Sequence, residues 1–463
     1  MNFKDAAQLL RNAQTIKHLL LMHQLIVATE QWEHHSPLFR LAGHLVQISG
    51  ATDVNVIDEL QQRDAFREIT DFLISPSAAD INVKLEAADT LGVFACSGPT
   101  MQEIIVPKFS QYSKRVYDGI ALTMPVVDQV NVVRNLIIPK LLVRVYAETV
   151  DPPVKLQIAR LFSNLIQSNI RNYFALCGIS MFALLIRGFA HHEPALQELL
   201  MTTLTYVALP FRYMPFGELE VFAEELRRGV DDKLSRFARK LIYDTLVKIA
   251  ELDDMSTDEA PKRTLYNVGI LPAVLHYLRA LTQQLNPLPS YDAAIPEFDL
   301  SLSRLSEEAQ EMFGSYNDSM HFIIQILDAC PENQQALRLV GSSDPSAVYA
   351  NQQHQDMRFN MHDFLFFAET RASCLRLLRL LITQDVRQHH RDLKSLIATL
   401  LSAPKAMILM KRDMVTMLRG CLRELRESKR VFAEESGVSA LSAMLWTLEG
   451  FFTRESQQAI EEV

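Results

Sequence analysis

Histidine is the residue type that most often transfers protons or binds metals in proteins, and this sequence contains pairs of adjacent histidines. The pairs occur at three places: His34 and His35, His191 and His192, and His389 and His390. Consecutive side chains on a helix point about 100° apart, whereas a helix that binds a metal uses positions i and i+4. We therefore predict structural or solvent-facing histidines and expect no metal site.

The cysteines and the familiar catalytic motifs give no better support for chemistry. The five cysteines lie far apart, without a C-x-x-C pair: Cys96, Cys177, Cys330, Cys374 and Cys421. This distribution is typical of buried free thiols in a reducing compartment. The chain also lacks a glycine-rich phosphate loop, an H-E-x-x-H pair, a nucleophile elbow and kinase motifs. We expect no enzymatic activity and no cofactor.

The composition favours a helical protein with a large core. Of the 463 residues, 48% are hydrophobic, 22% are charged and only 15 are glycine, which favours helices over turn-rich sheets. The net charge of −9 argues against a general nucleic-acid binder. The longest apolar stretches, such as residues 19–28, are shorter than the roughly 20 residues that a bilayer requires. No transmembrane span is expected.

An internal repeat defines the elements that position the surface. The segments "VKLEAADTLGVFA" from Val83 and "VKLQIARLFSNLI" from Val154 match nearly position for position. "LQELLMTTLTYVA" from Leu196 and "ARKLIYDTLVKIA" from Ala238 align with them, and the last three segments start 42 residues apart. Their apolar residues recur at i, i+3, i+4 and i+7, which predicts a buried amphipathic helix. Shorter apolar segments that contain Gly or Pro, such as "CGISMFALLIRGF" from Cys177, precede them.

A period of about 40 residues with two or three helices is typical of armadillo and HEAT arrays. The pattern N…G-I-x-x-L…L…V-x-x-x-A…L-x-N-L, clearest over residues 131–209, resembles the armadillo consensus. The resemblance implies an all-α fold: a right-handed α–α superhelix, or armadillo-like solenoid, with an irregular helical C-terminal part. The apolar stretch 172–190 is then explained, because neighbouring repeats cover both of its sides.

The repeat weakens along the chain, and we predict three parts. Residues 1–285 form the armadillo-like array with N-terminal capping helices, residues 286–318 a loop or insertion, and residues 319–463 degenerate helical repeats with a C-terminal cap. Three prolines between 287 and 296 block helix formation. A second polar break covers residues 341–358. Both breaks read as solvated loops, although residues 291–300 have a composition that also suits folding back along a groove or anchoring a partner.

The resemblance also implies a binding groove. In armadillo proteins that bind extended peptides, the third helices carry an asparagine ladder for the peptide backbone, with tryptophans one turn earlier. Asn164 occupies the ladder position here, and the aligned residues of the next repeats are Tyr206 and Lys248. The positions one turn earlier hold Arg160, Thr202 and Asp244. The only tryptophans, Trp32 and Trp446, lie off this ladder, so an import receptor of the importin alpha kind is not expected.

A basic segment is a second candidate surface. Residues 371–430 contain fourteen Lys and Arg against five Asp and Glu. Within residues 411–430, five arginines fall close to one helical stripe: Arg412, Arg419, Arg423, Arg426 and Arg430. This stripe is either a solvated helix face with local glutamate partners or a docking face for an acidic partner.

These observations predict a non-enzymatic scaffold or adaptor that binds a protein partner, such as an extended or acidic segment. The alternative is a structural subunit of a large eukaryotic assembly, ciliary, cytoskeletal or mitochondrial, which would show large apolar surface patches. The aromatic cluster in residues 361–367 is one place to look for such a patch. We expect a eukaryotic cytoplasmic protein, with the cilium or the mitochondrion as alternatives. The sequence does not specify the partner or the oligomeric state.

Overall fold

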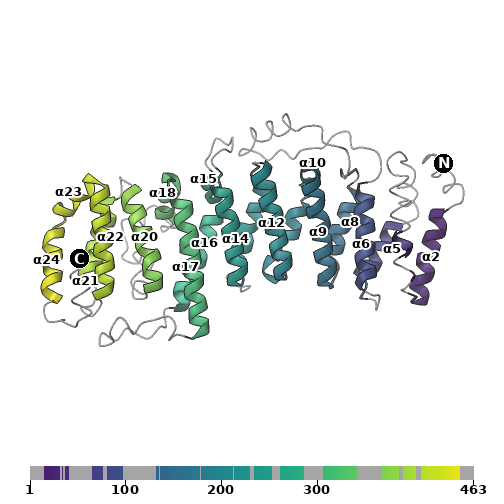
Figure 1. Cartoon of the computed structure of the whole chain (residues 1–463), viewed down its shortest axis with the longest axis horizontal. Helices are drawn as coiled ribbons and strands as arrows, with labels where there is room; N and C mark the ends of the chain where they lie inside the picture. The colour runs from purple at the N-terminus through teal and green to yellow at the C-terminus, as the bar shows by residue number, and fades with distance from the viewer. Residues whose placement is uncertain are drawn as a thin grey trace. The chain divides into compact units, whose positions relative to one another are not determined.

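The computed structural model is all-helical in the part of the chain that it describes, with about twenty helices there, as Figure 1 illustrates. The structure describes residues 15–31, 34, 37–40, 65–76, 81–96, 132–134, 136–177, 179–211, 213–229, 234–252, 261–285, 306–340, 368–384, 389–402 and 408–448. Every regular element within these ranges is a helix. The all-α prediction is therefore confirmed.

The chain divides into two compact units, and the first comprises residues 1–225 with 252–258. Its helices are α2 (Thr15–Thr29), α5 (Ala65–Ile74), α6 (Ile81–Ala95), α8 (Ile137–Glu148), α9 (Pro152–Ser168), α10 (Ile170–Cys177), α11 (Met181–Ile186), the 3₁₀ helix η2 (Phe189–His191), α12 (Pro194–Phe211) and most of α13 (Phe216–Arg228). The long helices α6, α9 and α12 pack side by side in that order. A second layer packs α5 on α8 and α8 on α11, and α8 also contacts α6 and α9.

The second unit comprises residues 226–251 and 259–463. It contains α14 (Arg236–Ala250), α15 (Pro261–Asn267), α16 (Ile270–Leu285), α17 (Glu307–Leu327), α18 (Pro331–Val340), α20 (Ala368–Gln384), α21 (His389–Ser402), α22 (Ile408–Glu424), α23 (Arg426–Glu434) and α24 (Gly437–Leu448). The long helices α14, α17, α20 and α22 again pack side by side in chain order. Helices α16 and α21 contact them from a second layer, and α24 packs on α21.

The predicted helix register is confirmed. Helices α9, α12 and α14 begin at residues 152, 194 and 236, each 42 residues after the one before. The third, seventh and eleventh residues of each helix are buried: Val83, Ala87 and Leu91 in α6; Val154, Ile158 and Phe162 in α9; Leu196, Leu200 and Leu204 in α12; Ala238, Ile242 and Leu246 in α14. The same three positions are buried in α22, at Met410, Met414 and Leu418. The repeat therefore continues beyond the part where the sequence shows it clearly.

The apolar stretch 172–190 is core, as predicted. It forms most of α10, then α11 and the start of η2, and its buried side chains include Tyr173, Phe182 and Phe189. Asn172 is also fully buried. Its amide oxygen accepts a hydrogen bond from Val133 N (2.8 Å), and its Nδ2 donates to Leu165 O (2.7 Å). A buried amide is stable here because both of its ends are bonded.

The fourth residue of each long helix is a long polar side chain, and in several helices it is buried. In three helices it donates to a carbonyl just beyond the preceding helix or in its final turn: Lys84 Nζ to Ser75 O (2.7 Å), Gln197 Nε2 to Phe189 O (2.8 Å) and Arg239 Nη2 to Gly229 O (3.2 Å). These three side chains are buried, as are the fourth-position residues of α20 and α22, Arg371 and Lys411. The last carbonyls of a helix have no partner within it, and Lys84 satisfies such a group at Ser75 O. Gln197 and Arg239 add a second hydrogen bond to carbonyls that also accept from His192 N (3.2 Å) and Leu234 N (3.1 Å).

Two observations bear on the expected boundaries. The two compact units divide within α13, at residue 225. The expected loop 286–318 is helical from residue 307, because α17 begins there. Ser306 caps this helix by accepting a hydrogen bond from Ala309 N on its Oγ (3.3 Å), which is a usual start signal. Residues 286–305, the break 341–358 and the aromatic cluster 361–367 lie outside the described residues.

Candidate functional site: the faces of the long helices

The four predicted groove residues of the first unit lie on neighbouring helices. Arg160 and Asn164 are the ninth and thirteenth residues of α9, and Thr202 and Tyr206 hold the same positions in α12. Three of them are exposed and Tyr206 is half-buried. Because α9 and α12 pack side by side, the four side chains share one surface, which we call the ladder face.

Hydrogen bonds between the helices fix the ladder face. Tyr206 Oη donates to Gln167 O of α9 (3.0 Å). Beneath the surface, Thr203 Oγ1 donates to Ser163 Oγ (2.8 Å), and both residues are buried. These bonds tie α12 to α9 at two depths. The spacing between the two rows of exposed side chains is thus set by the packed helices.

Helix α6 extends the ladder face by one repeat. Its ninth residue, Asp89, accepts a hydrogen bond from Gln157 Nε2 of α9 (2.6 Å). Burial raises the pKa of the Asp89 carboxyl, with a smaller contribution from the like charge of Glu86 and an opposing effect of the Gln157 bond. Glu86 itself is paired with Arg40 (2.5 Å). The acidic groups of this end are therefore engaged within the protein.

Three side chains of the ladder face are available to a ligand. Among the described residues, Arg160, Asn164 and Thr202 have neither a hydrogen-bond nor an ion-pair partner. Together they offer a cationic donor, an amide that both donates and accepts, and a hydroxyl. These groups suit hydrogen bonding to the main chain or polar side chains of another protein. They contain no base and nucleophile held together, as covalent catalysis requires.

The remaining two groove residues lie on the second unit. Asp244 and Lys248 are the ninth and thirteenth residues of α14, and both are exposed. Their local placement matches the prediction. They belong to the second unit, and the ladder face, which is defined on α9 and α12, does not include them.

The five predicted arginines do not lie on one helix, so the prediction of a single helical stripe is wrong. Helix α22 ends at Glu424, Leu425 adopts an extended conformation (φ −122°, ψ 123°), and α23 begins at Arg426. The break follows from packing, because α23 buries Val431 and Phe432 and contacts α21. No Gly or Pro marks the boundary in the sequence. The five arginines are consequently divided between two helices.

On α23, the two predicted arginines have different surroundings. Arg430 is paired with Glu427 and Glu434 on its own helix, while Arg426 is exposed. On α22, Arg412 is half-buried and paired with Asp413 (3.1 Å). Arg419 and Arg423 are exposed and, among the described residues, have no partner. Only part of the predicted set therefore presents free charge.

Sequence reasoning missed two arginines on the neighbouring helix α20. Arg376 is exposed, and Arg379 pairs with Glu424 of α22. For Arg376 the available signal was the register, because it is the ninth residue of α20, the position that is exposed in α9, α12 and α14. Arg379 holds the twelfth position, which is buried or half-buried in those helices, so the register gave no signal for it. With α20 packed on α22, the arginines of the two helices form one surface, which we call the arginine face.

A buried polar cluster was also missed. Glu218 of α13 is fully enclosed; its carboxylate accepts a hydrogen bond from Tyr173 Oη (3.1 Å) and a weaker one from Cys177 Sγ (3.7 Å). Burial raises its pKa to about 7, partly opposed by these bonds. Burial, with the neighbouring Glu218 adding to it, also raises the pKa of the Cys177 thiol. A raised thiol pKa is the opposite of what a nucleophile needs, so the cluster is structural.

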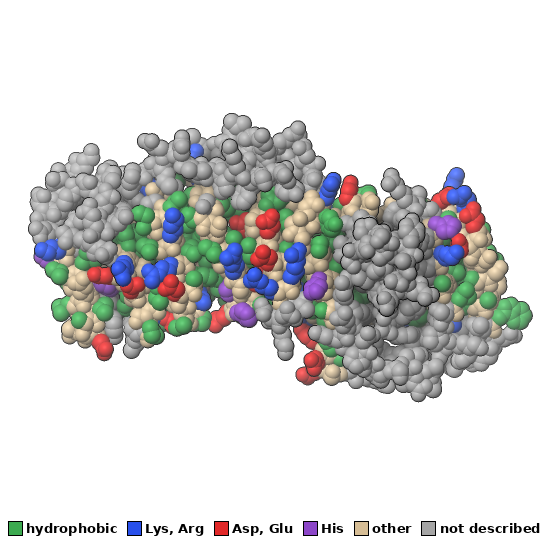
Figure 2. Space-filling model, turned by 180° about the vertical axis from the view of Figure 1, so that it is seen from behind, with side chains coloured by type: hydrophobic (Ala, Val, Ile, Leu, Met, Phe, Trp, Pro, Cys, Tyr) green, Lys and Arg blue, Asp and Glu red, His purple; other side chains and the backbone are tan. Residues whose placement is uncertain are grey.

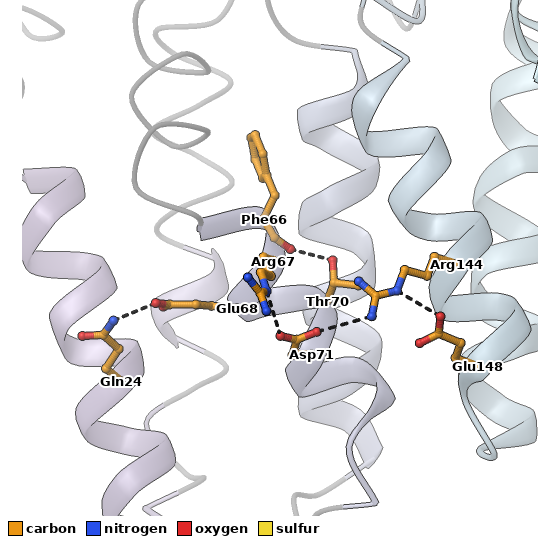
Figure 3. Close-up of polar contacts among 8 residues, drawn as sticks. All are labelled: Gln24, Phe66, Arg67, Glu68, Thr70, Asp71, Arg144 and Glu148. Atoms are coloured by element: carbon orange, nitrogen blue, oxygen red, sulfur yellow. Dashed lines mark hydrogen bonds and ion pairs between the residues drawn. The ribbon is translucent and has the colours of Figure 1, made fainter.

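A hydrogen bond and exposed ion pairs link helices α2, α5 and α8 (Figure 3). Gln24 of α2 donates to Glu68 of α5 (2.7 Å). Arg144 of α8 lies between Asp71 of α5 (3.9 Å) and Glu148 of its own helix (3.0 Å). Such solvated pairs contribute little to stability. The charged groups of Arg67, Asp71, Arg144 and Glu148 are thus engaged with one another.

Two of the described histidines make polar contacts within the protein. His192 accepts from or donates to Tyr146 Oη (3.0 Å), and His390 pairs with Glu435 (2.7 Å). Within the described ranges no group of three or more His, Cys, Asp or Glu is placed to hold a metal ion. All five cysteines are free thiols, and burial raises the pKa of Cys96 to about 11 and of Cys374 to about 12.

The face of the molecule drawn in Figure 2 carries side chains of both charges. Seen from the side opposite to Figure 1, acidic and basic side chains alternate with apolar ones over the described surface (Figure 2). Over the described part of the chain, no helix combines the length and apolar character needed to cross a membrane.

Comparison with known proteins gives one distant relative and no family. No protein-family model matches the chain. It is 22% identical over 361 residues to the BEACH domain-containing protein A2 of Arabidopsis thaliana, an alignment that covers 69% of this chain and 9% of that protein. The chain thus spans about 9% of the length of the curated relative that it matches.

Among solved structures, the crystal structure of an engineered protein aligns with 93% of this chain and 95% of its own, at 13% identity and a TM-score of 0.29. That score is too low to support the fold assignment, which rests on the helices, their register and their packing. On these grounds the chain is an all-helical, repeat-like protein.

Proposed function

We propose that this protein is a non-enzymatic scaffold of the armadillo type that binds protein partners on the exposed faces of its long helices. The observation that carries the proposal is the ladder face. There, Arg160, Asn164 and Thr202 are exposed and unpartnered among the described residues, on two packed helices. The resemblance to armadillo proteins assigns this face to the concave side of a solenoid, where an extended segment would lie.

The chemistry of the ladder face suits an extended segment. An extended chain has main-chain N–H and C=O groups that require partners along its whole length. An asparagine side chain provides both a donor and an acceptor. Packed helices are about 8–10 Å apart, which is about three residues of an extended chain at roughly 3.3 Å each. Arg160 on α9 and Thr202 on α12, which hold the same helix position, would therefore contact the segment at that interval.

The arginine face is a second surface of the proposed scaffold, suited to an acidic partner. We further propose that the protein works in the eukaryotic cytoplasm, with the cilium or the mitochondrion as alternative compartments.

The ladder face carries few charges of either sign that are not already engaged, so it would select its partner by hydrogen bonding. The two faces would then recognise chemically different segments.

Co-purification tests the proposal. The tagged full-length protein would be recovered from the cells that express it, and its partners would be quantified by mass spectrometry. We expect Arg160→Ala/Asn164→Ala to reduce at least one partner by about fivefold or more, since about 1 kcal/mol or more of binding free energy is removed. The control Arg171→Ala/Arg187→Ala changes two exposed residues outside the ladder face and should leave partner recovery unchanged. Equal recovery with both variants would refute the proposal.

An alternative function is a structural subunit of a large assembly. The observation that favours it is exposed apolar surface on α2 and α24, where Leu25 is 62% exposed and Trp446 is 74% exposed. A subunit of this kind aggregates when purified alone, whereas a scaffold stays monodisperse. Size-exclusion chromatography of the isolated full-length chain separates the two functions.

A further inference from the structure

The arginine face is built from two helices that carry no other type of exposed cation. Arg376 and Arg379 lie on α20, and Arg412, Arg419 and Arg423 lie on α22. The one lysine of α22, Lys411, is buried. A guanidinium is planar and always charged, and it binds a carboxylate through two parallel hydrogen bonds, which an ammonium does not. The choice of arginine throughout favours a ligand with carboxylate or phosphate groups.

The carboxylates of this face are already engaged. Asp413 is paired with the buried Arg371 (2.8 Å) and with Arg412 (3.1 Å). Glu424 is paired with Arg379 across the two helices. Within the described part of the chain, Arg376, Arg419 and Arg423 have no partner. The face therefore presents three uncompensated guanidinium groups in a chain whose net charge is −9.

The close packing of α20 on α22 brings these groups together. The Arg379 guanidinium lies over Gly420 of α22, where a Cβ would be 3.6 Å from Arg379 Cζ. Arg419 and Arg423 flank Gly420 on the same helix, and Arg376 precedes Arg379 by one turn on α20. The free arginines are thus distributed over two neighbouring rows, with the Arg379–Glu424 pair between them.

We propose that the arginine face binds an extended acidic segment of a protein partner. This inference rests on the proposed scaffold function and names the partner chemistry of its second surface. An extended chain in the polyproline II conformation places every third side chain on one side, about 9 Å apart. That interval matches the distance of about 8–10 Å between packed helices. Acidic residues at every third position would each meet one row of arginines.

Neither nucleic acid nor a membrane fits this face as well. Proteins that bind single-stranded nucleic acid stack the bases on aromatic side chains, and neither α20 nor α22 contains an aromatic residue. A helix that binds at a membrane surface presents Trp, Phe or Leu beside its basic residues. The exposed neighbours of these arginines are small or polar, such as Ala372 and Thr416.

The test is direct binding of a labelled peptide to the full-length protein, measured by fluorescence anisotropy. The probe is a fluorescein-labelled dodecapeptide of four Gly-Ser-Glu repeats, and its neutral counterpart contains Gln in place of Glu. We expect the acidic peptide to bind, the neutral one not to bind, and the affinity to fall steeply with added NaCl. Failure of the acidic peptide to bind better than the neutral one would overturn the inference.

Two matched triple variants locate the site. Arg376→Gln/Arg419→Gln/Arg423→Gln should weaken binding by about tenfold or more, since each exposed charge pair is worth a few-fold. The control is a second triple Arg-to-Gln variant, of Arg171, Arg187 and Arg227, three exposed arginines elsewhere in the chain. It makes the same change in net charge and should bind within about twofold of the wild type. Equal losses in the two variants would attribute binding to overall charge and refute the site.

Further arms separate this inference from the other possibilities and from the scaffold proposal. A labelled uridine dodecamer and vesicles with phosphatidylserine replace the peptide. Tighter binding of either one, abolished by the triple variant of the arginine face, would overturn the choice of an acidic protein segment. Arg160→Ala/Asn164→Ala should bind the acidic peptide normally. Failure of the peptide assay would refute the arginine face and leave the proposal for the ladder face standing. Failure of the co-purification test would refute the ladder face and leave the peptide assay a valid test of the arginine face.

Discussion

Replacing Glu218 by glutamine should remove a large pH dependence from the stability of the first unit. The carboxyl of Glu218 is enclosed by Tyr173 and Cys177, and burial raises its pKa from 4.5 to about 7. Gln keeps the shape and can still accept the hydrogen bond from Tyr173 Oη, but it does not ionise. The substitution therefore isolates the proton without emptying the site.

The direction of the pH dependence follows from whether the folded or the unfolded chain holds the proton of Glu218. Below about pH 4.5 the carboxyl is protonated in both the folded and the unfolded chain. Between about 4.5 and 7 the unfolded chain loses the proton while the folded one keeps it, so the free energy of unfolding falls as the pH rises. Above about 7 the loss is complete. The difference between the two pKa values corresponds to about 3 kcal/mol.

The assay compares wild type and Glu218→Gln by urea unfolding, followed by far-UV circular dichroism, at several pH values from 5 to 8. Iodoacetamide labelling of Cys177, quantified by mass spectrometry, localises the effect to this cluster. The difference in unfolding free energy should change by about 3 kcal/mol across this range in favour of Gln at high pH. The control Glu198→Gln, at an exposed position of α12, should track the wild type. A constant difference between wild type and Glu218→Gln at every pH would show that the folded protein holds Glu218 ionised and would refute the reasoning.

Three further substitutions test the packing between helices. Lys84→Met removes the buried partner of Asp151 (2.6 Å) and should lower the free energy of unfolding by about 3 kcal/mol, measured by urea unfolding. Gln197→Leu removes one of the two hydrogen bonds to the Phe189 carbonyl, which keeps the bond from His192 N (3.2 Å), and should cost about 1 kcal/mol in the same assay. Gly188→Ala meets no atom within 4 Å, but φ is +74°, so it should cost about 1 kcal/mol through backbone strain, seen as a lower melting temperature in calorimetry.

Exposed controls set the baseline for these substitutions. Arg67→Met breaks the solvated pair with Asp71 (3.7 Å) and should cost less than about 1 kcal/mol. Glu198→Leu, next to Gln197, should be near neutral. Similar losses for Lys84→Met and Arg67→Met would contradict the role given to burial. A Gln197→Leu variant as stable as the wild type would show that the hydrogen bond from His192 N satisfies the Phe189 carbonyl by itself.

The regular parts of this fold were predictable because the signal repeats. The starts of the long helices from α6 to α14 and their buried third, seventh and eleventh positions follow from a pattern that recurs at a fixed period. Exposure of Arg160 and Asn164 follows from the same pattern, since it places them opposite the buried stripe. Their role in binding stays a prediction.

The features that could not be predicted from the sequence depend on contacts between distant segments. Glu218 and Glu225 of α13 look like solvent-facing residues, yet both are buried, because Tyr173 and Phe189 N, one repeat earlier, provide their hydrogen bonds. The end of α22 at Glu424 was missed for a similar reason, since packing and not a helix-breaking residue separates it from α23. Tertiary contacts outweigh local preference at such sites.

The buried fourth-position donors also determine where the repeat can change length. A residue inserted between the fourth and seventh positions of α12 would turn the rest of the helix by about 100°. Gln197 would then stay on its carbonyl while Leu200 and Leu204 left the core. An insertion in the turn ahead of Pro194 would only lengthen a surface connection. Divergent copies should therefore vary in their turns and keep the first two turns of each long helix intact.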